Sequence, residues 1–235
     1  MTDPQSKTDS WKLFDRIARR YDRLNQVLSF GMAAGWRRSI IRCFPQKVNL
    51  DVLDVATGTA DIPLILARSP LSIRKIIGLD LSKGMLSVAR HKLERAGGSS
   101  RIELRSGDGQ NLPFDDNSFD VVTVGFGLRN FPDLMKGITE AYRVLRQGGS
   151  FIILEFSRPE GFPFHQLHEA YLRLVVPFVG LMLTGDLKAY DYLSRTAVAF
   201  PYGERFMRII RQAGFKEVER RPCFLGPVTI YISTK

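Results

Sequence analysis

The chain has 235 residues, of which 44% are hydrophobic and 25% are charged, a balance typical of a folded protein with a sizeable core. Its net charge of +10 attracts polyanions, so nucleic acid, an anionic membrane surface and a generally basic background are three open explanations. The two cysteines form no CxxC pattern, which argues against a zinc site or a disulfide framework and fits a reducing cytoplasm. The polar first ten residues lack the apolar run of a secretory signal.

Helical spacing of apolar residues dominates the start of the chain, from residue 11 to residue 44. After that the pattern changes to short strands that alternate with helices. Strands are predicted at 51–56, 74–80, 101–106, 119–124, 150–156, from 215 and at 228–233, and helices at 82–95, 133–146 and 202–213. Such alternation predicts a parallel sheet covered on both faces, and the last two strands look like an antiparallel edge pair.

The expected fold class is therefore α/β, a doubly wound, mostly parallel sheet of seven strands. We expect a single domain over residues 1–235, with a helical cap at 1–45. Residues 158–201 interrupt the alternation, and we interpret them as a helical insertion on the substrate side. The longest apolar run, 174–183, contains a proline and a glycine and falls short of the roughly 20 residues that span a membrane.

Two features lie at the carboxyl ends of the first two predicted strands, where open α/β sheets bind ligands. After the first strand comes Gly58, followed by Thr59, and a glycine lets the backbone approach a ligand closely. Asp80 ends the second strand, where a carboxylate can accept hydrogen bonds from ribose hydroxyls or cap the next helix. This loop lacks the further glycines of a pyrophosphate site, which favours S-adenosylmethionine (SAM) over a dinucleotide.

A third feature lies at the end of the third predicted strand. The segment Ser106-Gly-Asp108-Gly109 looks like the adenine-contacting loop of class I methyltransferases. Each feature alone is weak, but their order and spacing together predict a SAM-dependent methyltransferase with the class I fold.

A more specific resemblance covers the chain from about residue 11 to its end. Two segments resemble signatures of the UbiE/MenG family, the ubiquinone and menaquinone biosynthesis C-methyltransferases. The first runs from Tyr21-Asp22 through Leu28-Ser29-Phe30-Gly31 to Trp36-Arg37, and the second from Tyr142-Arg143 through Gly148-Gly149 to Glu155-Phe156-Ser157. The loop 126–130 and residues 185–193 and 200–201 of the insertion also match. The chain departs from the family pattern where Ala33 replaces a histidine and Gly125 a serine, so no histidine base is expected there.

The resemblance implies methyl transfer from SAM to a ring carbon of a polyprenylated hydroquinone, converting demethylmenaquinol to menaquinol, with the ubiquinone precursor as a second family substrate. A phenolic ring carbon is a poor nucleophile until the adjacent hydroxyl, with a pKa near 10, loses its proton. Arg129, after the fourth strand, is placed to stabilise the phenolate. Arginine cannot accept the proton, which we assign to water. A salt bridge at the surface is the alternative role for Arg129.

The expected site residues follow from these patterns. The predicted cofactor contacts are Gly58, Thr59, Asp80, Asp108, Gly109 and Gly125, and the predicted catalytic residues are Arg129 and Asn130, helped by Tyr21 and Asp22. Tyr21 has packing in the N-terminal helix as its alternative role. No metal is expected.

The insertion is aromatic and apolar, as a channel for a lipid-tailed substrate would be, although a helical lid over the core explains it too. Arginines 16, 19, 20, 23, 37, 38 and 42 are candidates for a basic rim that contacts an anionic membrane. We therefore expect a cytoplasmic protein, peripheral on the inner face of the membrane, and leave a homo-oligomer open.

The sequence bears on three rival functions. A nucleic-acid methyltransferase is disfavoured because residues 125–129 replace the Asn/Asp-Pro-Pro-aromatic motif of adenine enzymes, and no cysteine stands where pyrimidine enzymes need one. A non-catalytic SAM-fold scaffold is disfavoured by Gly58, Asp80 and Arg129. Another small-molecule C- or O-methyltransferase is the nearest rival.

Overall fold

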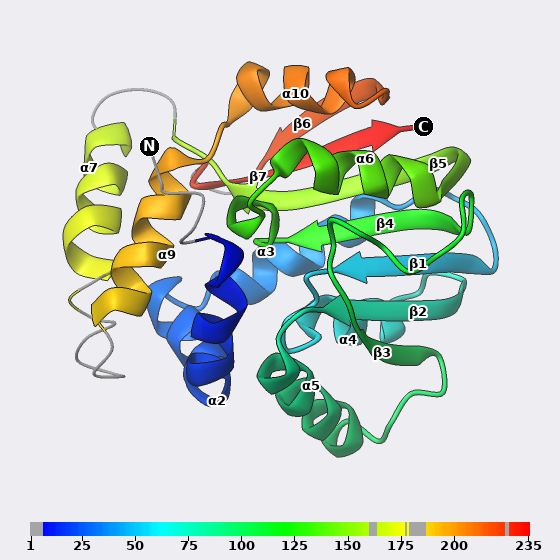
Figure 1. Ribbon diagram of the computed structural model, residues 1–235, viewed down its shortest axis with the longest axis horizontal. Coiled ribbons are helices and arrows are strands. Elements are labelled where there is room, and N and C mark those ends of the chain that lie inside the picture. The colour runs from blue at the N-terminus through cyan, green and yellow to red at the C-terminus, as the bar shows by residue number, and fades with distance from the viewer. Residues whose placement is uncertain (1–6, 160–163, 177, 179–186, 224–225) are drawn as a thin grey trace.

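The computed structural model describes residues 7–159, 164–176, 178, 187–223 and 226–235, and its centre is a seven-stranded sheet (Figure 1). The strands are β1 Leu50–Val55, β2 Ile73–Asp80, β3 Ile102–Ser106, β4 Phe119–Gly125, β5 Leu145–Phe156, β6 Lys216–Pro222 and β7 Val228–Thr234. Their order is β3-β2-β1-β4-β5-β7-β6, with β1 to β5 parallel and β7 antiparallel to both β5 and β6. The predicted α/β class and the antiparallel edge pair are confirmed.

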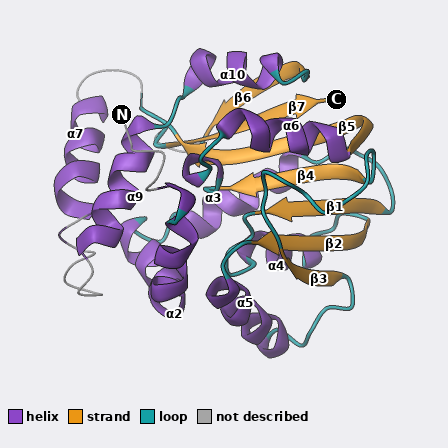
Figure 2. Ribbon diagram, in the orientation of Figure 1, coloured by secondary structure: helices purple, strands orange, loops and turns teal. Residues whose placement is uncertain are grey.

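Helices flank this sheet and gather at one end of it (Figures 1 and 2). They are α2 Ser10–Leu28, α3 Ala33–Ser39, α4 Asp61–Ala67, α5 Lys83–Arg95, α6 Leu134–Val144, α7 Phe164–Ala170, α9 Leu187–Ala199 and α10 Gly203–Gln212, with shorter turns η1 Ile40–Cys43, η2 Leu128–Asn130 and η3 Tyr171–Val175. The arrowheads of β1 and β4 point toward the end where α2, α7 and α9 lie. Loops at the carboxyl ends of the parallel strands therefore face these three helices.

The hydrophobic core has two halves, one on each face of the sheet. Leu53 and Val55 of β1 belong to the half that contains residues of α6 and α10. Val52 belongs to the other half, with Trp36 of α3 and Ile62 of α4. Successive side chains of a strand point to opposite faces, which explains why β1 carries apolar residues on both of its faces.

Helix α6 ends earlier than the sequence predicts. We expected the helix to reach residue 146 and the glycine pair to end it, but the helix stops at Val144. Leu145 already pairs with Phe119 of β4, so the glycines lie within β5. Gly148 has a φ of +71°, and a Cβ on Gly149 would lie 2.7 Å from the Arg146 carbonyl oxygen. The pair therefore shapes a tight bend in the strand.

Helix α2 is fastened across the start of α5. Ser82 caps α5, as predicted, by accepting a hydrogen bond from the Met85 amide at 3.1 Å. Asp15 of α2 accepts hydrogen bonds from the Ser82 hydroxyl and from the Gly84 amide, the latter at 2.8 Å. A carboxylate at a helix N-terminus is favourable, so Asp15 stabilises the contact between the two helices.

The insertion contains α7, η3 and α9. Its matches to the family at residues 185–186, and the apolar residues Phe162, Leu181 and Met182, lie outside the described residues. Within the part of the chain that the structure describes, no helix has both the length and the apolar character that crossing a membrane requires.

Candidate active site

A cavity of about 280 Å³ lies at the carboxyl ends of β1, β2 and β4, and we call it the cofactor cavity. Five of the six predicted cofactor residues line it, namely Gly58, Asp80, Asp108, Gly109 and Gly125. Helix α2 and the segment before it close the other side with Lys7, Trp11, Phe14 and Tyr21. The predicted loops therefore converge on one cavity, and α2 covers it.

Asp80 organises the loops on the strand side of this cavity. One carboxylate oxygen accepts a hydrogen bond from the Gly58 amide at 2.7 Å, and the other accepts one from the Ser82 amide at 2.9 Å. Burial raises the pKa of Asp80, an effect that these amides oppose and the nearby charge of Asp15 reinforces. Asp80 thus supports the next helix and also lines the cavity.

Close backbone packing explains the glycines around the cavity. A Cβ on Gly109 would lie 2.5 Å from the Phe131 ring and 2.7 Å from a methyl group of Val55. A Cβ on Gly125 would lie 2.5 Å from Cδ1 of Ile62, so the serine usual in the family would crowd that side chain. With an acid for the ribose and apolar walls from Trp11 and Leu79, these residues fit the adenosine of SAM.

A larger cavity of about 440 Å³, which we call the apolar cavity, adjoins the first. It is lined by α2, α3, α7, α9 and the ends of β4 and β5, mostly with apolar and aromatic side chains. Among the described lining residues, the charged ones are Arg37 and Arg129. Tyr21 and Phe126 line both cavities, so the two meet at this pair.

Arg129 lies on η2, just after β4, and its side chain is buried with 5% exposure. Its Nη1 donates to Oε1 of Glu155 at 2.8 Å and to the Phe126 carbonyl oxygen at 2.6 Å. The guanidinium carbon lies 4.9 Å from the centroid of the Phe156 ring. The buried Nε–H finds no hydrogen-bond partner among the described residues. Arg129 is therefore held rigidly at the cavity through Nη1. Nη2, which donates to no described residue and is not among the buried atoms without a partner, is the donor left for a ligand.

Asn130 and Tyr21 lie at the junction of the two cavities. Asn130 lines the cofactor cavity, and its buried Oδ1 has no hydrogen-bond partner within the described chain. Its amide nitrogen donates to the Phe126 carbonyl oxygen at 3.5 Å, an oxygen that Arg129 also uses. The structure thus brings three of the four predicted catalytic residues to one junction.

Asp22 and Thr59 line neither cavity. The Thr59 hydroxyl donates to one carboxylate oxygen of Asp22 at 2.6 Å, and Lys92 of α5 lies 2.8 Å from the other. Lys92 also binds Asp61 at the start of α4. These residues join α2, α4 and α5, and we leave them out of the proposed chemistry.

The sequence suggested that Arg37 belongs to an exposed basic rim, and this prediction is wrong. Arg37 is buried with 9% exposure and lines the apolar cavity, because α3 packs against the sheet with this residue facing inward. Its guanidinium carbon lies 5.7 Å from the centroid of the Phe126 ring, and Nη1 lies 3.4 Å from Asp61. The other proposed rim arginines, 16, 19, 20, 23, 38 and 42, are exposed.

The sequence interpretation gave two further buried residues, Glu155 and Asp54, no place near the site, and it assigned Arg37 to the rim instead. Asp54 of β1 is buried and accepts hydrogen bonds from the hydroxyls of Thr57 and Thr123, each at 2.6 Å. Burial raises its pKa to about 7. A carboxylate within an otherwise apolar strand was the available signal for both acids, because such a group needs buried partners.

The family model of the ubiE/COQ5 methyltransferases matches residues 2–235. The chain belongs to this family. A demethylmenaquinone methyltransferase of Bacteroides fragilis is 43% identical over 224 residues, which are 95% of this chain and 91% of that protein. The ubiquinone/menaquinone biosynthesis C-methyltransferase UbiE of Geotalea daltonii is 39% identical over 95% of both chains.

Solved structures support the fold assignment. A SAM-dependent methyltransferase of Thermotoga maritima, described as a possible histamine N-methyltransferase, matches with a TM-score of 0.67 and 22% identity over 96% of this chain and 99% of that one. A SAM-dependent methyltransferase of Methanococcus maripaludis matches with a TM-score of 0.65 and 22% sequence identity. The match covers 94% of this chain and 93% of that one. This member of the ubiE/COQ5 family therefore has the class I fold, and it is an enzyme that uses SAM.

Proposed function

We propose that the chain methylates a ring carbon of demethylmenaquinol to give menaquinol. The observation that carries the proposal is the apolar cavity, which adjoins the cofactor cavity and has buried arginines in its lining. Prenylated naphthoquinols combine an apolar ring and tail with two oxygens, and this lining matches both parts. The name that the Bacteroides fragilis relative carries supports the same substrate. In this proposal residues 1–45 and 158–201 enclose the substrate side of a single domain.

SAM, when bound, supplies an electrophilic methyl group. The protein's part is to make the ring carbon nucleophilic, which requires negative charge on the adjacent ring oxygen. Nη2 of Arg129, which has no hydrogen-bond partner among the described residues, donates to that oxygen, and the guanidinium stabilises its ionised form at neutral pH. Glu155 acts as a positioning residue, since it fixes the guanidinium from the neighbouring strand.

Proton removal is assigned to water at the cavity junction. Arginine holds no acceptor, so the proton passes to a water that Arg129 and Asn130 orient. Tyr21 and Phe126 close the junction around the ring and exclude bulk solvent. Holding the carbon in line with the methyl group then supplies much of the rate.

A bacterial strain whose own demethylmenaquinone methyltransferase gene is deleted tests this function. Expression of the chain is expected to restore menaquinone in the extracted lipids, as measured by mass spectrometry. Expression of the Arg129→Lys variant at the same level is expected to leave demethylmenaquinone in its place. The proposal is contradicted if the wild-type chain is expressed and the lipids still contain demethylmenaquinone at the level of the deletion strain.

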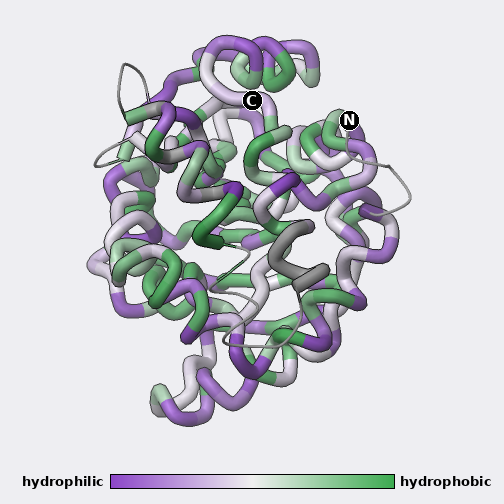
Figure 3. Tube along the Cα trace, turned by 90° about the vertical axis from the view of Figure 1, so that its left-hand side faces the viewer, coloured by the Kyte–Doolittle hydropathy of each residue, from purple (hydrophilic) through white to green (hydrophobic). Residues whose placement is uncertain are grey.

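We also propose that the mouth of the apolar cavity rests on an anionic membrane. Phe30, Phe164 and Leu167 line the cavity and are 76%, 57% and 62% exposed, so they stand where it opens. Phe30 contacts Tyr171 of η3, with ring centroids 5.9 Å apart, so the end of α2 and the insertion form one surface. Figure 3 views the molecule from this side, where hydrophobic and hydrophilic segments are interleaved.

Charge supports an anionic lipid as the partner of this surface. Helix α2 carries exposed arginines at positions 16, 19, 20 and 23, near the exposed Val27 and Phe30. We expect co-sedimentation with phosphatidylglycerol vesicles at low salt, and less binding by an Arg19→Glu/Arg23→Glu variant or at high salt. Equal binding to neutral phosphatidylcholine vesicles contradicts the electrostatic part of this proposal.

A further inference from the structure

Arg37 has a local environment that a purely structural arginine would not need. Its side chain is buried beside an apolar cavity, yet the one ion pair that it forms with a described residue, Asp61, has a nitrogen–oxygen distance of 3.4 Å. It donates no hydrogen bond to any other described residue, although a guanidinium has five N–H donors. No nitrogen of Arg37 is among the buried atoms without a partner, so its unpaired donors open into the apolar cavity. There they can bind a ligand that supplies acceptors.

The position of Arg37 relative to Arg129 indicates what that ligand offers. The two guanidinium carbons lie 5.7 and 5.9 Å from the centroid of the same Phe126 ring. That ring belongs to the junction of the two cavities. A carboxylate is absent from the described lining of the apolar cavity. The two arginines therefore present donors to a molecule with two electron-rich oxygens near the place of methyl transfer.

A 1,4-hydroquinone has this pair of oxygens, but they do different work. One is adjacent to the carbon that gains the methyl group, and its negative charge activates that carbon. The other is not adjacent and contributes little to activation, so binding it serves to orient the ring. On the proposed function, Arg129 takes the first oxygen.

We infer that Arg37 binds the second ring oxygen and selects substrates with oxygens at both ring positions. This inference rests on the proposed function and names a residue that sets its specificity. Arg37 is thus a substrate-binding residue. Its loss raises KM, whereas the loss of Arg129 lowers kcat. Asp61 keeps Lys92 as a partner, so replacing Arg37 does not leave Asp61 unpaired.

The test compares two substrates and two variants. The first substrate is a 1,4-naphthalenediol with one prenyl unit, and the second lacks the hydroxyl that is not adjacent to the reacting carbon. The variants are Arg37→Gln and Arg37→Lys, with Arg38→Gln, an exposed neighbour on the same helix, as the matched control. Both kcat/KM and anaerobic calorimetric dissociation constants are measured for each pair.

Wild type and Arg38→Gln are expected to prefer the diol by about tenfold or more, the worth of one hydrogen bond to a charged group. Arg37→Gln is expected to reduce this preference to within about twofold, mainly through KM, and Arg37→Lys to restore part of it. The inference is overturned if the wild type does not prefer the diol, or if Arg37→Gln keeps that preference. It is also overturned if Arg37→Gln loses the same share of kcat/KM on both substrates. Diol-selective binding without methylation would instead overturn the proposed function and support the role of Arg37.

Discussion

Nη1 of Arg129 lies 2.8 Å from Oε1 of Glu155, and both side chains are buried. The cation after β4 is therefore fixed by an anion on β5, the strand beside it. Removing either partner leaves the other charge buried and unpaired. Arg129→Ala and Glu155→Ala should each lower the free energy of unfolding by about 3–5 kcal/mol.

Urea titration of each variant measures this effect. The double variant Arg129→Met/Glu155→Met is the control, because replacing both charges by apolar groups removes the unpaired ion. It should recover most of the lost stability and show no methyl transfer. Single variants as stable as the wild type would contradict the buried pair.

Arg129→Lys separates charge from geometry. An ammonium can still pair with Glu155, but it lacks the planar fork that reaches both Glu155 and a ring oxygen. We expect methyl transfer to fall by about 10²-fold or more, roughly 3 kcal/mol of transition-state stabilisation. SAM affinity should stay near the wild-type value, since Arg129 does not line the cofactor cavity. Raising the pH should rescue part of the rate as solvent ionises the phenol.

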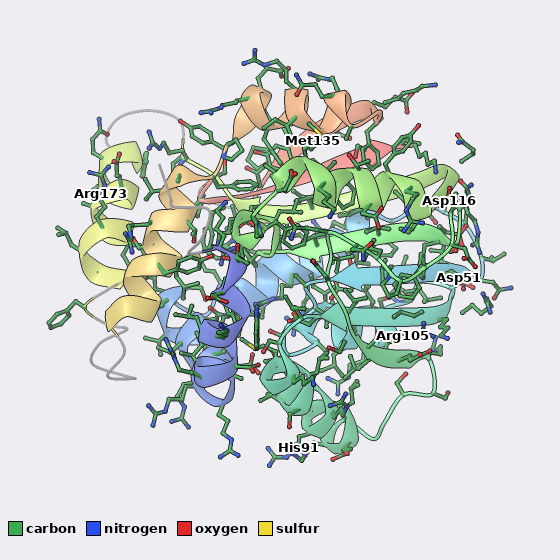
Figure 4. All side chains as sticks on the ribbon, in the orientation of Figure 1. Asp51, His91, Arg105, Asp116, Met135 and Arg173 are labelled. Carbon is green, nitrogen blue, oxygen red and sulfur yellow. The ribbon has the colours of Figure 1, made fainter. Side chains whose placement is uncertain are left out.

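Asp80→Asn tests the cofactor cavity. The amide keeps the size of the side chain but removes the charge that the ribose hydroxyls are expected to meet, at a cost of about 2–4 kcal/mol of SAM binding. Calorimetric titration of SAM measures the difference. Asp116→Asn is the control, because Asp116 lies at the opposite end of the sheet (Figure 4). An unchanged affinity in Asp80→Asn would remove Asp80 from the cofactor site.

Asp54 predicts a pH dependence of stability. Burial raises its pKa to about 7, so the folded protein keeps a proton that the unfolded chain releases near pH 4. Asp54 therefore stabilises the fold below its unfolded pKa, and this stabilisation is lost as the pH rises toward 7. The slope is at most about 1.4 kcal/mol per pH unit. Unfolding free energies of wild type and Asp54→Asn between pH 4.5 and 8 measure it, and equal slopes would exclude Asp54 as the source.

The sequence predicted the sheet well because β1, β2 and β4 carry apolar residues on both faces and each parallel strand is bounded by loop residues. It also predicted that Gly58, Asp80 and Asp108 lie close together, and they line one cavity, since the carboxyl ends of parallel strands meet at one edge. These inferences need only local patterns and the topology that the patterns imply.

Features that depend on contacts between distant segments were not predictable in this way. Glu155 is 26 residues from Arg129 in the chain, and nothing local pairs them. Arg37 resembled its exposed neighbours until the packing of α3 placed it in the apolar cavity. The end of α6 was misjudged because pairing of Leu145 with β4 overrides the local signal of the glycine pair.

The most direct test of the proposed function uses purified protein, SAM with a ¹³C-labelled methyl group and a short-chain demethylmenaquinol kept reduced. Nuclear magnetic resonance of the product identifies the atom that carries the label. We expect a ¹³C signal of a methyl group on the ring carbon beside the prenyl-bearing carbon, formed from the quinol and absent with the oxidised quinone. A label on a ring oxygen, or no label in a protein that binds SAM, would contradict C-methylation.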